Sequence, residues 1–173
     1  IRILDSRRYG SCAVDFTFRY IMHPILYSKK LPKIIPEDFE EIIKQMWKDQ
    51  KPYLKWTNQY NTKLEDNHNK LDPLWKEFCN IPEKIISPKT YYVYINDKNW
   101  HKTHWHDHSK TASIVAVYYL SKNNSIEFID KNDKVITYNP KQYEMIYFLG
   151  NTKHRPIPNS DYRFSINIEG YHK

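Results

Sequence analysis

The chain has 173 residues, of which 16% are aromatic and only three are glycine, and its formal net charge is +7. This length suits a single domain built round one compact core, so we expect residues 1–173 to form one domain. The positive charge favours anionic partners, but the lysines are scattered and not gathered in one run. Nucleic acid is therefore a partner that the composition allows and does not favour.

The two cysteines, Cys12 and Cys79, lie far apart and show no spacing typical of a zinc knuckle or a redox pair. We expect both to be buried thiols in a reducing compartment. No apolar run is long enough to span a membrane, and the first residues lack the apolar stretch of a secretory signal. The sequence thus predicts a cytoplasmic protein with no membrane partner.

The N-terminal part predicts extended segments and then a helix. Residues 1 to about 35 alternate poorly and carry prolines near their end, so we expect extended chain that covers a sheet. Pro36-Glu37-Asp38 is typical of a helix start, because proline fits the first turn and carboxylates favour the positive end of the helix dipole. This helix should end before Pro52. Its apolar face would carry Phe39, Ile42, Ile43 and Met46.

A second helix is predicted from Asp72, which would act as the N-cap before Pro73. Its buried side would carry Leu74, Trp75 and Phe78. We expect residues 1–89 as a whole to form a helical and extended support for the rest of the chain.

From residue 90 onward the pattern changes to short β-rich runs separated by polar turns such as Asn132-Asp133. Such spacing predicts a sandwich or barrel, so the expected fold class is mainly β with flanking helices, and residues 90–173 would form its β core. The six candidate strands are Tyr91 to Ile95, Ala112 to Leu120, Ser125 to Ile129, Lys134 to Tyr138, Glu144 to Leu149 and Tyr162 to Ile168.

Three histidines of this β half form the most informative pattern in the chain. Residues two apart in an extended strand project from the same face, so His106 and His108 can converge on one ion. His154 follows the fifth β-rich run and would reach the same ion from a neighbouring strand. Imidazole is a good ligand for iron, zinc, copper and nickel, so the pattern predicts a metal site without naming the metal.

The register of the histidine pair is open, because His104 and His106 have the same spacing as His106 and His108. We favour the later pair, which leads directly into the second β-rich run, and keep His104 as an alternative ligand. Asp107 should face away from the ion and serve as an outer hydrogen-bond partner or a turn residue. A histidine-rich surface loop without metal is the other reading of this segment.

An arginine and a serine follow the last histidine. Arg163 comes nine residues after His154, and Ser165 follows two residues later on the same face of a strand. The guanidinium group offers a fork of donors that suits a carboxylate. This part of the sequence predicts a site for an acidic co-substrate next to the metal.

Taken together, four segments resemble the iron(II) and 2-oxoglutarate-dependent oxygenases, most closely prolyl-hydroxylase-like and bacterial or phage members. The resemblance covers roughly residues 90 to 170 and implies a double-stranded β-helix, the jelly-roll fold that cupins share, buttressed here by the N-terminal helices. The segments are His106-Asp107-His108, Ala116 to Leu120, Met145 to Leu149 before His154, and Arg163-Phe164-Ser165.

The resemblance also implies roles. His106 and His154 would bind iron(II), and Arg163 would form a salt bridge with the distal carboxylate of 2-oxoglutarate, to which Ser165 and Tyr118 would donate hydrogen bonds. The expected activity is hydroxylation of a small molecule or a peptide with molecular oxygen. The sequence does not indicate which substrate.

One departure from the family pattern concerns the third ligand. The usual motif is His-x-Asp or His-x-Glu, whereas this chain has His108 where the carboxylate belongs. A third neutral ligand leaves more positive charge on the iron, which strengthens binding of an anionic co-substrate and makes the metal harder to oxidise. Trp100, Trp105 and Tyr119 are candidates for the wall of the cavity, with plain core packing as the alternative.

Two other functions remain open from the sequence. One is a cupin-type dioxygenase that does not use 2-oxoglutarate, although cupins place a glutamate shortly after His-x-His and residues 109–113 contain none. The other is a non-catalytic β-sandwich whose histidines bind a metal.

Overall fold

The computed structural model describes residues 23–50, 59–63, 68–86, 90–96, 104–157 and 163–173. In this part of the chain, two antiparallel sheets are present. The larger sheet has the strand order β1-β7-β4-β9-β3-β2, and the smaller one has the order β6-β5-β8. The strands are β1 (Ile25–Lys30), β2 (Gln59–Lys63), β3 (Thr90–Asn96), β4 (Ile114–Tyr119), β5 (Ile126–Ile129), β6 (Val135–Tyr138), β7 (Glu144–Leu149), β8 (His154–Pro156) and β9 (Arg163–Gly170).

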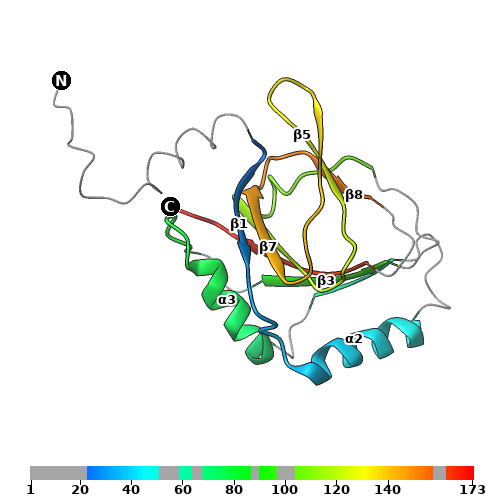
Figure 1. Ribbon diagram of the computed structural model, residues 1–173. Coiled ribbons are helices and arrows are strands. Elements are labelled where there is room, and N and C mark those ends of the chain that lie inside the picture. The colour runs from blue at the N-terminus through cyan, green and yellow to red at the C-terminus, as the bar shows by residue number, and fades with distance from the viewer. Residues whose placement is uncertain (1–22, 51–58, 64–67, 87–89, 97–103, 158–162) are drawn as a thin grey trace.

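Within the described ranges, two α-helices lie on one side of the larger sheet, and the smaller sheet lies on the other (Figure 1). Helix α2 (Glu37–Gln50) begins and ends where the prolines predicted. Helix α3 (Asp72–Cys79) follows a short 3-10 turn, η2 (His68–Leu71). The predicted cap was wrong by one residue, because Leu71 is the N-cap and makes no side-chain capping bond. The mainly β architecture with flanking helices is confirmed.

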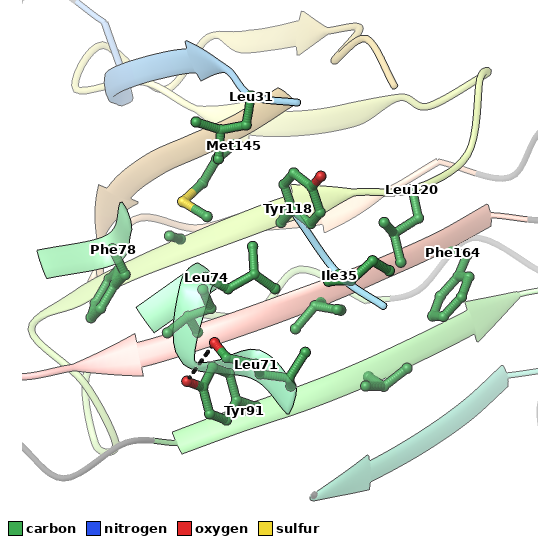
Figure 2. Close-up of a cluster of buried hydrophobic side chains, with 14 of the residues drawn as sticks. Leu31, Ile35, Leu71, Leu74, Phe78, Tyr91, Tyr118, Leu120, Met145 and Phe164 are labelled. Atoms are coloured by element: carbon green, nitrogen blue, oxygen red, sulfur yellow. Dashed lines mark hydrogen bonds between the residues drawn. The ribbon is translucent and has the colours of Figure 1, made fainter. Parts of the chain in front are cut away.

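The outer core lies between the larger sheet and the helices (Figure 2). Leu74 and Phe78 of α3 are fully buried there. The hydroxyl of Tyr91 on β3 donates a hydrogen bond of 3.1 Å to the carbonyl of Leu71, which joins the start of α3 to the sheet. The hydroxyl of a buried tyrosine needs a hydrogen-bond partner, so this bond helps to fix the position of α3 on the sheet.

The inner core lies between the two sheets. Phe128 of β5 and Phe148 of β7 pack edge to face in it, with ring centroids 5.3 Å apart. Every residue of β4 is buried because alternate residues enter the two cores: Val117 and Tyr119 face inward, while Tyr118 faces outward. Burial on both faces explains the unbroken apolar run that predicted this strand.

All six predicted β-rich runs form strands, and three further strands were not predicted. β1 pairs with β7 as the edge of the larger sheet, where only covering segments were expected. β2 pairs with β3, and β8 pairs with β5. The sequences of these strands are short or polar and show little alternation of apolar and polar residues. Their formation therefore depends mainly on pairing with a neighbouring strand. The turn at Asn132-Asp133 joins β5 to β6 as predicted, with Asp133 at φ 58.

Some expectations about single side chains differ from the structure or lie outside the described residues. Cys79 is exposed and not buried, and Trp75 is half-buried. Cys12 lies outside the described residues, as do the side chains of Ile42, Ile43 and Met46. Among the helices that the structure describes, none has the length and apolar character needed to cross a membrane.

Candidate metal centre

Two of the three histidines face each other across a β-bridge. His154 begins β8 and pairs with Phe128 of β5 on one side. On its other side it exchanges two backbone hydrogen bonds with His106, of 2.9 and 3.1 Å. This bridge adds the histidine segment to the edge of the smaller sheet, so two residues 48 positions apart lie directly opposite each other.

His108 completes the group from the same segment. Its backbone nitrogen donates to the carbonyl of Gly150, at the end of β7, over 2.6 Å. One ring nitrogen from each of His106, His108 and His154 lies within 4.8 Å of those of the other two. The ring centroids are 4.4 to 5.6 Å apart. The structure therefore gathers the three predicted ligands, whereas His104 is not part of this group and contributes only its backbone carbonyl, beside Nδ1 of His106.

In each of the three rings, Nδ1 lies within hydrogen-bond distance of an acceptor oxygen. Nδ1 of His106 lies 3.2 Å from the carbonyl oxygen of His104, and Nδ1 of His154 lies 2.9 Å from that of Thr152. Nδ1 of His108 lies 2.8 Å from a carboxylate oxygen of Glu169. Because these partners accept, each Nδ1 must carry the proton, which leaves the Nε2 lone pairs for a metal.

Loss of solvent favours the neutral form of two of these imidazoles, those of His154 and His106. Loss of solvent, followed by the neighbouring His106, lowers the pKa of His154 from 6.5 to about 3. Loss of solvent is also the main reason that the pKa of His106 is lowered. Nε2 of His108 is buried and has no hydrogen-bond partner among the described residues. Three ring nitrogens that face one another, one of them buried and without a partner among the described residues, fit a divalent transition metal.

Asp107 does not belong to this group of ligands. Its exposed carboxylate accepts hydrogen bonds from the backbone nitrogen and the hydroxyl of Ser109, at 3.0 and 2.6 Å. These bonds lower the pKa of Asp107. The residue stabilises the turn that follows the histidines, which is one of the two roles predicted for it.

Arg163 lines a small cavity of about 60 Å³ together with His106 and His154. Its guanidinium carbon lies 5.5 Å from the centre of the Tyr119 ring. Ser165, the next inward residue on β9, is fully buried, and its hydroxyl has no hydrogen-bond partner among the described residues. The cavity thus combines a cation with two of the clustered histidines, and the hydroxyl of Ser165 lies two residues further along the same face of β9. Its other lining residues are Tyr94, Val117, Ile126, Pro156 and Asn167.

The structure does not bring Tyr118 to this cavity. Its side chain lies in the outer core, and its hydroxyl donates a hydrogen bond of 3.0 Å to the carbonyl of Pro32. Neighbouring residues of a strand face opposite sides of the sheet, so Tyr119 faces inward instead. Tyr118 therefore lies on the other side of the sheet from the cavity at which it was predicted to bind the co-substrate.

Of the three aromatic wall candidates, Tyr119 lies in the inner core, and Trp100 lies outside the described residues. Trp105 is half-buried beside the histidines. The guanidinium carbon of Arg155 lies 4.2 Å from the centre of its indole ring. Nε of Arg155 also donates a hydrogen bond of 2.7 Å to Glu127. This bond holds Arg155, and with it the contact to Trp105, next to His154.

Three inward polar residues were not predicted from the sequence: Tyr94, Asn167 and Glu169. A signal for two of them was present, because the segment from Arg163 to Glu169 alternates strictly between polar and apolar residues. Extending the period of two from Arg163 and Ser165 places Asn167 and Glu169 on the same inward face. Glu169 also lies just beyond the predicted end of the strand.

At the sequence level, the chain matches no protein-family model and no curated protein. Its fold is nevertheless similar to solved prolyl hydroxylases. A prolyl-4-hydroxylase from Pseudomonas putida has a TM-score of 0.59 at 10% identity, over 92% of this chain and 98% of that one. A prolyl hydroxylase from Trichoplax adhaerens, in complex with a peptide fragment of hypoxia inducible factor, has a TM-score of 0.55 at 12% identity, over 83% and 82% of the two chains.

A prolyl 4-hydroxylase from Phytophthora capsici has a TM-score of 0.55 at 15% identity, over 75% of this chain and 52% of that one. Likeness at such low identity concerns the fold, and it confirms the predicted double-stranded β-helix with flanking helices. The roles of individual residues must be argued from the site itself.

Proposed function

We propose that this protein is a non-haem iron(II) and 2-oxoglutarate-dependent oxygenase that hydroxylates a small molecule or a peptide. The observation that carries the proposal is the convergence of His106, His108 and His154, with their ring nitrogens within 4.8 Å of one another, beside a cavity lined by Arg163. The shared fold with prolyl hydroxylases supports it.

In this proposal, the Nε2 atoms of the three histidines bind iron(II). Their Nδ1 partners orient the rings before the metal arrives, and burial keeps His154 in the neutral form that a metal requires. The rings of Phe128 and Phe148 pack against His154, with centroids 6.1 and 4.7 Å away. This apolar support excludes water from one side of the metal.

The cavity beside the histidines would bind the co-substrate. Arg163 would form a bidentate pair with the distal carboxylate of 2-oxoglutarate, and the unsatisfied hydroxyl of Ser165 would donate to the same group. Tyr94, which pairs with Ser165 across the sheet and lines the cavity, takes the place proposed earlier for Tyr118. The small volume suits one end of a slender dicarboxylate.

Bound iron(II) would supply the oxidative chemistry, in which oxygen and 2-oxoglutarate yield succinate, carbon dioxide and a hydroxylated substrate. The protein's own contribution is to hold the metal, to anchor the co-substrate at Arg163 and to keep bulk water out. Val117 and Ile126 form the apolar part of the cavity wall.

The test is a visible spectrum of anaerobic protein with iron(II), recorded with and without 2-oxoglutarate. We expect the weak charge-transfer band of the chelate to appear only with the co-substrate. Arg163→Ala should weaken co-substrate binding at least about 30-fold, because a buried charge-assisted pair costs about 2–5 kcal/mol or more when truncated. Arg163→Lys should restore part of it.

Arg155→Ala is the matched control. This arginine lies next to His154, but its Nε donates to Glu127, and it does not line the cavity. We expect the band to persist in this variant. A protein that binds metal and gives no band with 2-oxoglutarate would instead be a cupin-type enzyme or a non-catalytic metal-binding sandwich.

A further inference from the structure

We infer that Glu169 supplies, through His108, the negative charge that a carboxylate ligand would otherwise bring to the metal. This inference rests on the proposed function, because it concerns the same metal centre. Glu169 would be a positioning residue, which acts on the metal through the imidazole that it holds.

The first support is the position of Glu169. It lies on the inward face of β9, in the polar row that begins at Arg163, and only 6% of its surface is exposed. Its Oε1 atom lies 2.8 Å from Nδ1 of His108, and no lysine or arginine among the described residues pairs with it. A buried carboxylate without a cationic partner is costly, so its placement against a histidine needs a reason.

The second support is the contrast among the three histidines. His106 and His154 each direct Nδ1 to a neutral backbone carbonyl two residues back in their own segments. His108 alone of the three directs Nδ1 to a charged group, which comes from a strand 61 residues away. Its other nitrogen, Nε2, is buried without a partner among the described residues. A local bond would suffice to hold the ring, so the carboxylate adds charge as well as orientation.

The third support is the charge balance of the site. Three neutral imidazoles leave a divalent ion with its full charge, whereas a triad with one carboxylate reduces the net charge to about +1. Glu169 restores that balance from one residue further out. A carboxylate on Nδ1 also makes the imidazole a stronger donor to the metal. The substitution of His108 for the usual acidic ligand is therefore compensated on β9.

The experiment measures iron(II) affinity and the reduction potential of the bound iron in the full chain under anaerobic conditions. We expect Glu169→Ala to weaken metal binding about 10- to 100-fold, the usual effect of losing such a partner. Glu169→Gln keeps the shape and an acceptor oxygen but removes the charge, so it should bind more tightly than Glu169→Ala while raising the reduction potential. A purely structural role would not move the potential.

A double-variant cycle makes the compensation explicit. His108→Asp returns a carboxylate to the metal directly, so adding Glu169→Gln to it should change affinity by no more than about twofold, the ordinary error of additivity. In the chain that keeps His108, Glu169→Gln should weaken metal binding by its full amount. Glu144→Gln is the control, since Glu144 is similarly buried but binds Tyr138 and the backbone of Lys141.

Unchanged metal affinity and potential in both Glu169 variants would overturn the inference, as would equal losses in Glu144→Gln. Those results would leave the proposed function standing, provided that the unaltered chain binds iron and forms the 2-oxoglutarate band. If the unaltered chain binds no metal, the proposed function and this inference both fail.

Discussion

At the scale of single residues, His154 combines two opposing demands. It is 3% exposed and packs against the ring of Phe148, and in the proposed function it also binds a metal ion. Burial removes the charged form of the ring, because a protonated imidazole would lie among apolar side chains and beside His106. The neutral ring is the form that binds a metal, so the packing prepares the ligand.

The lowered pKa of His154 predicts acid sensitivity in the metal-free protein. Above pH 6.5, the folded and unfolded states are both neutral at this residue. Between pH 6.5 and about 3, only the unfolded state takes up the proton, so the free energy of unfolding falls as the pH drops. The slope should be about 1.4 kcal/mol per pH unit for this group.

Urea unfolding of chelator-treated protein at pH 7.0 and pH 5.5 measures this slope. His154→Gln carries no proton in either state, so its stability should change less over the same interval. Equal slopes for the two proteins would show that His154 is not protected from protonation by its surroundings.

At the scale of elements, the site depends on how the histidine segment is attached to β4 and β7. The carbonyl of Gly150 accepts from the backbone nitrogen of His108, and the nitrogen of Gly150 donates to Ser113, just before β4. A Cβ atom on Gly150 would lie 1.9 Å from the carbonyl oxygen of Ala112. Glycine is needed here because the two backbones approach closely, and this approach brings the histidine segment against the sheet.

Gly150→Ala should therefore lower the free energy of unfolding by at least about 1–3 kcal/mol, because the backbone at Ala112 cannot yield as a flexible side chain would. It should also weaken metal binding, since His108 is attached to the same residue. Denaturant unfolding and metal titration measure the two effects. Asn151→Ala, at the exposed neighbouring position, should stay within about 0.5 kcal/mol of the unaltered chain.

At the scale of the whole molecule, the larger sheet separates two cores with different functions. The outer core attaches the helices to the sheet (Figure 2), and the inner core packs against His154 of the candidate metal centre. Phe78 of α3 belongs to the first, and Phe148 of β7 belongs to the second; both are fully buried. The two cores share the strands between them, so stability depends on both, whereas metal binding should depend on the inner one.

Phe78→Ala and Phe148→Ala test this separation with the same chemical change. Each should cost about 3–5 kcal/mol of stability, the usual range for a buried phenylalanine. Only Phe148→Ala should weaken metal binding, because its ring lies 4.7 Å from that of His154. Metal titration of the two variants, under conditions where both stay folded, compares their metal affinities. An equal loss of affinity in Phe78→Ala would contradict the separation.

The sequence by itself determined the features that depend on neighbouring residues. The period of two gave the six main strands and placed His106 and His108 on one face, and proline marked both ends of α2. The fold class followed from the spacing of these elements. Such patterns are local, because backbone geometry alone decides which side chains share a face.

Only the tertiary structure decided which distant residues meet. It turned Tyr118 into the outer core and placed Glu169 against His108. It also recruited β1 and β8, whose short sequences carry no strong period of their own. The physical reason is that strand register and the choice of buried face arise from packing between sheets, and no single segment contains that information.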